Sequence, residues 1–303
     1  MRSEKLKNIR LQSSIHTFNV RSVDEPTIPS HISNSIVKAS YNKSGKTWII
    51  RINPNKFEKG DILVYSEFMA LTKKLFEEMN IRDCRFWRTD IRLDSYEDNF
   101  KDYYKLNLLL ISLLSMEIND PNGQAISHML TCTKEFSDIS TKNQYWEIKY
   151  YDKKFQTHDT DRTKSRLEFR SLKATQNVDY RPHIVKEKWF EKLNKLIYRY
   201  DELQKQCNDL LFTSYQDYCV YNRNMCNSKD VLTKFFSVYS NAMTVFTRDQ
   251  LRGFFKMCGV ASGTVEERIK YICDKTNIEF ISKSNLQEYI KIIKESMNDF
   301  FSC

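Results

Sequence analysis

The chain has 303 residues, of which 41% are hydrophobic and 13% aromatic, and it contains only 6 glycines and 5 prolines. This composition can form a core and excludes a disordered or collagen-like chain. The net charge of +9 favours a partner that carries phosphates, because lysine and arginine release counterions when they neutralise phosphate groups. No apolar run reaches the ~20 residues of a membrane span, and the charged N-terminus lacks the apolar region of a signal peptide, so we expect a cytoplasmic protein.

The eight cysteines form no C-x-x-C pair, and neither they nor the five histidines show the spacing of a zinc site. In a reducing compartment we expect these cysteines to be buried apolar residues or free thiols.

The first half of the chain alternates segments with the period of a strand and segments with the period of a helix. The expected strands are residues 14–20, 48–52, 84–94, 145–151 and 166–172, and the expected helices are residues 64–79 and 99–116. This order predicts an α+β fold in which an antiparallel sheet carries helices on one face.

From residue 185 onward the pattern is almost wholly helical, and we expect helix boundaries at Thr247, Gly259, Thr264 and Ser284. The sequence therefore predicts two domains, an α+β domain of residues 1–183 and a helical domain of residues 184–303. Residues 264–272 resemble the recognition helix of a DNA-binding helix-turn-helix. A helical bundle that serves only packing or dimerisation explains the same pattern.

Charged side chains recur at every second position on two of the expected strands, so they share one face. The first strand carries Arg88, Asp90, Arg92 and Asp94, and the second carries Arg166, Glu168 and Arg170. Carboxylates at the centre suit a divalent metal, and arginines at the rim suit phosphate. The alternative is an exposed face of cross-strand ion pairs, each contributing a few tenths of a kcal/mol to ~1 kcal/mol.

The segment QYWEIKYYDKKF, residues 144–155, carries two adjacent tyrosines. Alternation points Tyr150 and Tyr151 to opposite faces, so one belongs to the core and the other stands beside Lys149 and Lys153. A phenol with a pKa of ~10 is a weak nucleophile at neutral pH. A neighbouring cation or metal would stabilise the phenolate, and attack on a phosphate would give a phosphotyrosyl ester.

Four fragments in this order, IIRINPNKF, FWRTDIRLD, EIKYYDKK and RLEFRSL, lie between residues 48 and 173. In wording and spacing they resemble the replication-initiation proteins of filamentous phages and small plasmids, the gene II/X-like family. The resemblance implies an HUH-like Rep nuclease fold and a rolling-circle endonuclease that nicks one strand at an origin. It also implies that a tyrosine of the protein stays joined to the 5′ end.

Carried onto this sequence, the resemblance implies Tyr151 as the nucleophile, with Tyr150 in reserve, and Lys153 as the cation that stabilises the phenolate or the phosphate. It implies Asp90 and Glu168 as ligands of Mg²⁺ or Mn²⁺, which would polarise the phosphate. The partners would be origin DNA, single-stranded or hairpin, and a host helicase and polymerase. The residues expected to bind DNA are Arg88, Arg92, Lys149, Arg166 and Arg170.

The sequence departs from better-known relatives because it has no His-hydrophobic-His triplet; His128 and His158 are alternative metal ligands. Tyr218 is an alternative nucleophile, although its spacing from Tyr215 and Tyr221 is that of a packed helix stripe. Two other functions remain open: an origin-binding initiator without catalysis, and a helical interaction protein whose charged strands are solvated surface.

Overall fold

The computed structural model of the chain describes residues 6, 9–32, 37–57, 64–118, 129, 138–158, 162–172, 179–221 and 229–302, without the side chains of residues 218–221. It divides into two compact units. The sheet unit comprises Glu4–Phe100, Ser140–Leu193 and Tyr289–Cys303, and the helical unit comprises Met1–Ser3, Lys101–Ile139 and Asn194–Glu288. The sequence-based boundary at residues 183 and 184 stays a prediction.

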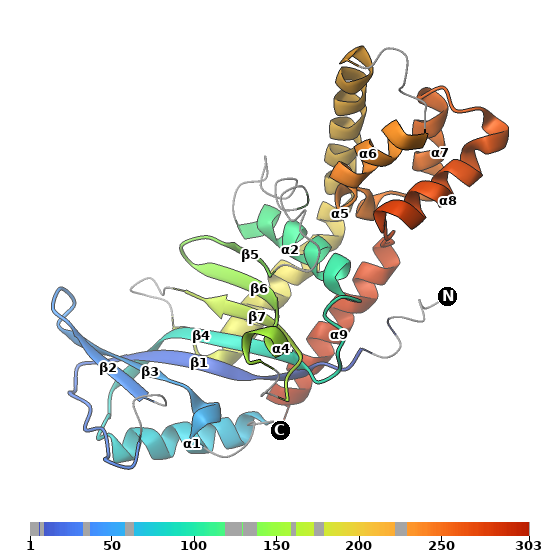
Figure 1. Cartoon of the computed structure of the whole chain (residues 1–303). Coiled ribbons are helices and arrows are strands. Elements are labelled where there is room, and N and C mark those ends of the chain that lie inside the picture. Colours follow the sequence, from blue (N-terminus) through green and yellow to red (C-terminus); the bar gives the residue numbers. More distant parts are fainter. Residues whose placement is uncertain are drawn as a thin grey trace. The chain divides into compact units, whose positions relative to one another are not determined.

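The sheet unit is built on a seven-stranded antiparallel sheet with the strand order β2-β3-β1-β4-β7-β6-β5 (Figure 1). Its strands are β1 (Gln12–Ser22), β2 (Val37–Asn42), β3 (Thr47–Ile52), β4 (Cys84–Ser95), β5 (Ile139–Lys142), β6 (Trp146–Asp152) and β7 (Ser165–Ser171). The predicted α+β class and antiparallel sheet are thus confirmed. The HUH identity of the fold stays a prediction.

One face of the sheet is apolar because the strands alternate hydrophobic and polar side chains. Ile91 of β4 lies directly opposite Phe169 of β7, and Phe169 lies opposite Ile148 of β6; all three are fully buried. The same alternation sends the arginines and acidic residues of these strands to the other face. The apolar face therefore forms the core, and the polar face carries the candidate site.

Three helices pack on the apolar side: α1 (Tyr65–Glu78), the beginning of α5 (Pro182–Tyr221) and the end of α9 (Lys283–Phe301). Phe68 of α1 meets Phe18 of β1 edge to face, with ring centroids 5.3 Å apart. Trp189 of α5 contacts Phe169, with centroids 5.0 Å apart. Helix α9 packs on α1 through Phe301, whose ring lies 4.9 Å from that of Tyr65.

Two strands were not expected from the sequence. The edge strand β2 contains lysine, serine and asparagine, and β5 is only four residues long, so neither shows a clear apolar alternation. Both lie at the edges of the sheet. Pairing with a neighbouring strand, which a single segment cannot reveal, holds them in extended conformation.

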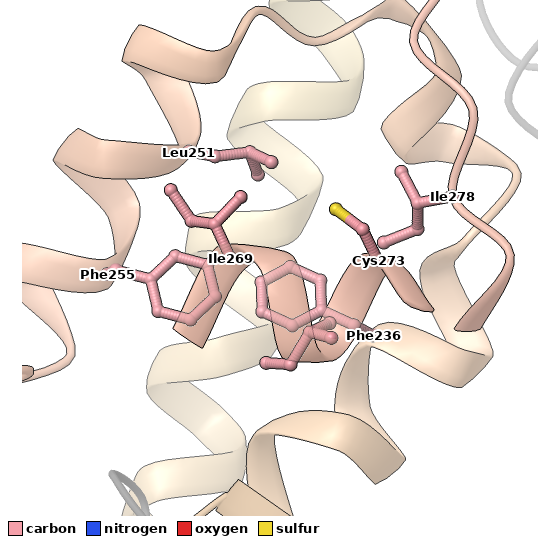
Figure 2. A pocket seen from close by; sticks show the side chains of 7 residues that line it. Phe236, Leu251, Phe255, Ile269, Cys273 and Ile278 are labelled. Atoms are coloured by element: carbon pink, nitrogen blue, oxygen red, sulfur yellow. The ribbon is translucent and has the colours of Figure 1, made fainter. Parts of the chain in front are cut away.

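The helical unit contains α2 (Tyr104–Ile118), the rest of α5, α6 (Lys229–Tyr239), α7 (Arg248–Met257) and α8 (Val265–Thr276). Seven apolar side chains close its core around a space with no room for a water molecule (Figure 2). They are Phe236, Leu251, Phe255, Ile269, Ile272, Cys273 and Ile278. Within the described residues, no helix is long and apolar enough to span a bilayer.

The predicted helix boundaries at Thr247 and Thr264 are confirmed, and Thr247 forms a capping box with Gln250. Gly259 follows α7 with a φ of 77°, a conformation that glycine adopts without steric cost. The boundary expected at Ser284 is wrong, because α9 begins at Lys283. The hydroxyl of Ser282 accepts the backbone N–H of Asn285, so Ser282 supplies the cap.

We predict that Trp189→Ala lowers the free energy of unfolding of the sheet unit by about 3–5 kcal/mol, because Trp189 is fully buried against Phe169 and Trp146. The matched control is Tyr198→Ala on the same helix, whose side chain is 82% exposed and whose loss should cost less than ~0.5 kcal/mol. Denaturant unfolding followed by tryptophan fluorescence and circular dichroism measures both; equal effects would contradict the assignment of Trp189 to the core.

Candidate functional site

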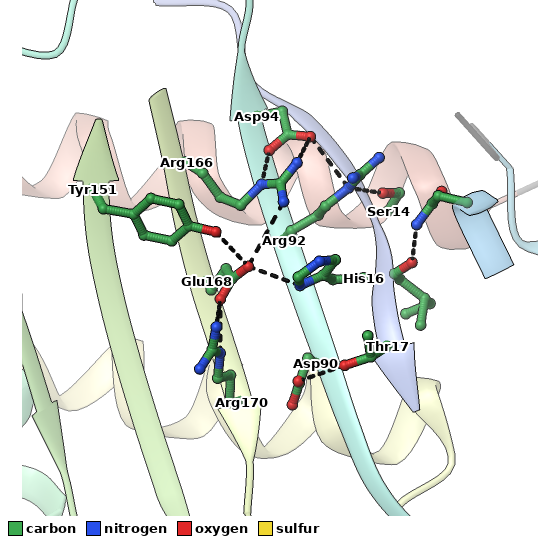
Figure 3. A network of polar contacts seen from close by, with 12 residues as sticks. Ser14, His16, Thr17, Asp90, Arg92, Asp94, Tyr151, Arg166, Glu168 and Arg170 are labelled. Carbon is green, nitrogen blue, oxygen red and sulfur yellow. Dashed lines mark hydrogen bonds and ion pairs between the residues drawn. The ribbon is translucent and has the colours of Figure 1, made fainter. Parts of the chain in front are cut away.

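The polar face of the sheet carries a dense network of charged side chains from four adjacent strands, β1, β4, β7 and β6 (Figure 3). Its arginines and acidic residues lie opposite one another in the strand register: Asp90 faces Arg170, Arg92 faces Glu168, and Asp94 faces Arg166. The prediction that the two charged strands share one face is therefore confirmed. The network is more buried than an exposed face of ion pairs would be, since Asp90, Asp94, Glu168 and Arg166 are all at most 3% exposed.

Glu168 is the centre of this network and is fully buried. Its Oε1 accepts the hydroxyl of Tyr151 at 2.8 Å and lies 2.8 Å from Nδ1 of His16. Its Oε2 accepts two N–H groups of Arg170, one of them from Nε at 2.7 Å. One carboxylate thus joins three strands, β1, β6 and β7.

These contacts set the ionisation of both Glu168 and Tyr151. Burial alone would raise the pKa of Glu168, but His16, Arg170 and Arg166 outweigh burial and hold its pKa well below the usual range. Burial, reinforced by the neighbouring Glu168 carboxylate, raises the pKa of the Tyr151 phenol. In the free protein Tyr151 is therefore a neutral hydrogen-bond donor, and Glu168 is ionised.

Asp90, the first predicted metal ligand, is held by two partners. Arg88 donates from Nε to Oδ1 at 2.9 Å and from the terminal nitrogen to Oδ2 at 2.7 Å. The hydroxyl of Thr17 donates to Oδ2 at 2.7 Å. This bidentate pair makes Arg88 the link between the buried network and the solvent, because 24% of its side chain is exposed.

A second bidentate pair closes the other end of the network. Arg166 donates to both oxygens of Asp94, at 2.5 and 2.9 Å, and these contacts outweigh burial and raise the pKa of the guanidinium. Arg92 lies 3.2 Å from the same carboxylate and donates to Ser14 at 2.6 Å. Arg166 and Arg92 are only 3% and 7% exposed, so they are engaged with protein acids rather than presented to a ligand.

His16 is the site residue that the sequence analysis missed. The pairing of β1 with β4 shifts register between Ile15 and Thr17, so His16 occupies a β-bulge, a device that re-aims a side chain. Its Nδ1 is buried and close to Glu168 but forms no hydrogen bond of good geometry with any described group. The sequence signal was a step of three, instead of two, between the apolar residues Ile15 and Phe18.

The two tyrosines take the places that alternation predicts. Tyr150 lies in the core, stacks on Phe100 at 4.8 Å and donates its hydroxyl to the Phe100 carbonyl at 3.2 Å. Tyr151 and Lys149 share the polar face, where Lys149 lies 3.3 Å from Glu147.

The expectation that Lys153 shares the strand with Tyr151 is wrong. Strand β6 ends at Asp152, whose carboxylate caps the short helix α4 (Lys153–Gln156) by accepting the N–H of Phe155 at 2.8 Å. Because α4 begins at Lys153, strand alternation does not place its ammonium group beside the phenol.

The predicted metal ligands do not fit a divalent cation as the side chains stand. A carboxylate offers about four lone-pair positions. Three hydrogen bonds from Tyr151 and Arg170 take three of those of Glu168, and Nδ1 of His16 lies 2.8 Å from Oε1 and covers the fourth, while Asp90 has one left. No group of three or more metal-ligating side chains occurs among the described residues. A cation at Glu168 would have to displace His16, Tyr151 or Arg170.

The other sequence candidates lie away from this network or outside the described residues. His158 is exposed in the turn after α4, with a φ of 49°. His128 and the side chain of Tyr218 are not described. In the would-be recognition helix α8, the exposed or half-exposed charges are balanced between acids and bases, so charge does not favour phosphate binding there. They are Glu266, Glu267, Asp274, Arg268, Lys270 and Lys275.

No family model matches the chain, and a search of curated proteins finds no relative. The resemblance to phage and plasmid initiators therefore rests on the four fragments alone. What the structure adds is that Tyr151 and the charged strand residues of three of these fragments lie on one face of one sheet.

We predict that Glu168→Gln lowers the free energy of unfolding by about 3–5 kcal/mol near neutral pH, because buried arginines lose their counter-ion. The control Glu295→Gln, on an α9 side chain that is 60% exposed, should change it by less than ~0.5 kcal/mol. Denaturant titrations of both variants measure the difference.

The Glu168→Gln substitution should also change how the stability of the fold depends on pH. Because the pKa of Glu168 is lower in the folded chain, its ionisation stabilises the fold above the unfolded-state pKa of ~4.3. This stabilisation is lost as the pH falls from there through the folded-state pKa. In denaturant titrations between about pH 6 and 3, the free energy of unfolding should fall less steeply for Glu168→Gln than for the wild type. Equal losses in the two proteins would contradict the assignment of Glu168 as an ionised, buried carboxylate.

Proposed function

We propose that the chain is a plasmid or phage replication initiator that nicks and rejoins a DNA strand at an origin through a covalent 5′-phosphotyrosine on Tyr151. The observation that carries the proposal is the convergence of the Tyr151 hydroxyl, the Glu168 carboxylate and Arg170 on one sheet face. A phenol, an acceptor for its proton and a guanidinium that binds phosphate are the groups that such a reaction needs.

The proposed step forms a bond between the Tyr151 oxygen and phosphorus and breaks the bond between phosphorus and the 3′ oxygen. The phenolic proton passes to Glu168, which already accepts it in a hydrogen bond at 2.8 Å. The departing 3′ oxygen takes up a proton from solvent water and becomes the free 3′-OH that a polymerase extends. The reverse reaction rejoins the strand and regenerates the phenol.

This step requires the substrate to change the ionisation of the site. In the free chain Glu168 is a poor base, because Arg170 and His16 hold its pKa low. Arg170 is 19% exposed and reaches both Glu168 and Glu147, so a DNA phosphate can compete for its N–H groups. Losing part of this guanidinium contact raises the pKa of Glu168, and phosphate binding thereby prepares the base that accepts the tyrosine proton.

Dependence on Mg²⁺ or Mn²⁺ and delivery of DNA to a host helicase and polymerase belong to the same proposal. No step above passes through the cation, since the contacts of Glu168 leave no lone pair for it. Bound near the phosphate, such a cation would supply Lewis-acid polarisation. The helix-turn-helix of α7 and α8 stays a prediction of a second DNA contact.

One observation favours the alternative of an origin-binding initiator without catalysis. Tyr151 is only 7% exposed, and its raised pKa disfavours the phenolate. In that case the buried network is structural, and DNA is bound elsewhere on the chain. The reading as a helical interaction protein differs from both because it predicts no salt-dependent DNA binding.

We predict that the wild-type chain, incubated with a random pool of labelled single-stranded 40-mers and either Mg²⁺ or Mn²⁺, forms a protein–DNA adduct that survives denaturation. Tyr151→Phe should reduce the adduct by at least about 10³-fold, because it removes the nucleophile. Mass spectrometry of the digested adduct should locate the nucleotide on residue 151.

The matched control is Tyr150→Phe, which removes the neighbouring phenol from the core and should leave the adduct in place. An adduct that persists in Tyr151→Phe would contradict the assignment of the nucleophile. DNA binding by a wild-type chain that forms no adduct with either cation would support the non-catalytic alternative. Addition of EDTA to the wild-type reaction tests the cation directly.

A further inference from the structure

His16 contacts Glu168 but has no chemical task of its own in the proposed reaction. Its Nδ1 lies 2.8 Å from Oε1 of Glu168, the same oxygen that accepts the hydroxyl of Tyr151 at 2.8 Å. This Nδ1 is buried and has no hydrogen bond of good geometry among the described residues. A buried polar atom without such a bond needs an explanation, and a catalytic role is one of the recognised explanations.

A β-bulge brings His16 to the polar face of the sheet. Strand β1 shifts its pairing with β4 at His16, and the next residue, Thr17, lies opposite Asp90. Thr17 donates its hydroxyl to Asp90 while His16 reaches Glu168, so two consecutive side chains contact the charged network. In a regular strand, consecutive side chains point to opposite faces. Bulges are common beside active sites because they re-aim a side chain in this way.

Tyr151 and His16 approach Glu168 from opposite sides (Figure 3). In the strand order β1-β4-β7-β6, Glu168 of β7 lies between Tyr151 of β6 and His16 of β1. The hydroxyl oxygen of Tyr151 and Nδ1 of His16 are at most 5.6 Å apart, because each lies 2.8 Å from the same carboxylate oxygen. In phosphoryl transfer the attacking and leaving oxygens are roughly in line across phosphorus. A phosphate lying over Glu168 would therefore have the nucleophile on one side and the imidazole on the other.

The imidazole of His16 has an outward edge that a DNA strand can reach. Nδ1 is turned inward and buried, whereas 23% of the His16 side chain is exposed, so its outward nitrogen is Nε2. Arg170, the guanidinium proposed to bind the phosphate, contacts the same carboxylate and is 19% exposed. Tyr151 is only 7% exposed. A phosphate that approaches the site therefore meets His16 and Arg170 before it meets the phenol.

The chemistry of the proposed step calls for a proton donor at the leaving oxygen. Attack by Tyr151 exchanges an alcohol oxygen on phosphorus for a phenol oxygen, and a phenol has a pKa of ~10, far below that of an alcohol. The 3′ oxygen is therefore the poorer leaving group, and it departs readily only if it is protonated as its bond to phosphorus breaks. General acids supply this assistance, and histidine is the side chain most often used.

We propose that His16 is a catalytic residue, the general acid that donates its Nε2 proton to the departing 3′ oxygen. The inference rests on the proposed function and replaces solvent water as the source of that proton. A protonated imidazole has two N–H groups, so Nδ1–H can face the Glu168 carboxylate while Nε2–H faces the DNA. Because protein groups occupy the lone pairs of Glu168, this carboxylate anchors the imidazole rather than a metal ion. The Nδ1 contact would become aligned when DNA binds, as catalytic hydrogen bonds often do.

Two proton transfers accompany the exchange of bonds. As the Tyr151 oxygen bonds to phosphorus, its proton passes to Glu168. As the bond between phosphorus and the 3′ oxygen breaks, the Nε2 proton of His16 passes to that oxygen. The covalent intermediate therefore contains a neutral imidazole and a protonated carboxyl group. Rejoining runs both transfers backwards: the imidazole takes the proton of the 3′-OH, and Glu168 returns its proton to the phenol oxygen.

The test uses a leaving group that needs no acid. One of the 40-mer sequences recovered from wild-type adducts is made twice, with oxygen or with sulfur as the bridging 3′ atom of the cleaved linkage. A thiol such as that of cysteine has a pKa of ~8.5, so a thiolate departs without a proton. Rates of adduct formation are compared for the wild type, His16→Asn and the control His31→Asn. His31 is 62% exposed and lies beside Glu78, outside the network.

Asparagine keeps an N–H group that can face Glu168, but it has no proton to give to a leaving group. We expect His16→Asn to slow the reaction of the oxygen-linked strand by about 10²-fold or more, the usual contribution of a general acid. On the sulfur-linked strand its rate should stay within about 10-fold of the wild-type rate, because no acid is needed there. His31→Asn should match the wild type on both strands.

The two linkages separate an acid from a residue that only holds Glu168 in place. Equal losses on both linkages, or no loss on either, overturn the assignment of His16 and leave the nicking proposal standing. A wild type that cleaves the sulfur linkage in Mn²⁺ but not in Mg²⁺ also overturns it, because Mg²⁺ prefers oxygen ligands and the cation would then act on the leaving atom. A wild type that yields no adduct from the random pool overturns both proposals. If circular dichroism shows that His16→Asn is unfolded, His16→Gln takes its place under the same criteria.

Discussion

The buried carboxylate of Glu168 is the constraint on which the polar half of the sheet depends. A charge without solvent contact is costly unless opposite charges and hydrogen bonds surround it. Here Tyr151, His16 and Arg170 surround it from three strands, so the register of β1, β6 and β7 and the rotamers of all three partners are tied to one group. A one-residue slip of any of these strands would turn its side chain to the apolar face and leave the charge unpaired.

That network exists because the opposite face supplies the hydrophobic stabilisation. Phe18, Ile91 and Phe169 are fully buried beneath α1 and α5, and they occupy the alternate positions of the strands that carry the charges. Burying ions on one face of the sheet costs free energy. Burial of apolar side chains on the other face of the same strands offsets that cost. Such a sheet keeps a dense polar site rigid without help from loops.

The alternation of side chains made much of this predictable. The shared face of the charged residues in 88–94 and 166–170 was predicted correctly, because side chains alternate regularly throughout both stretches. The same rule failed at the bulges, where Ile15 is followed by Phe18 and Phe86 by Thr89, steps of three that conceal His16 and Trp87. The sequence could not predict which residues pair across strands. The spacing within a strand shows which residues share a face, but only the register between strands shows that Arg166 lies opposite Asp94 and Arg21 opposite Arg85.

The register divides the cations of this face into two kinds with different consequences. The charge of an arginine that faces an acid is already neutralised by a carboxylate of the protein. A ligand therefore gains little by binding such an arginine unless it displaces the carboxylate. Lys38 and Arg51 face one another at the exposed end of the sheet and form no ion pair among the described residues, so they add little to folding and stay accessible to an added anion. Arg88 stands between the two kinds, since it holds Asp90 while 24% of its side chain is exposed. An anion that binds Arg88 competes with Asp90 for its guanidinium, so Arg88 is the side chain through which a bound anion affects a buried carboxylate.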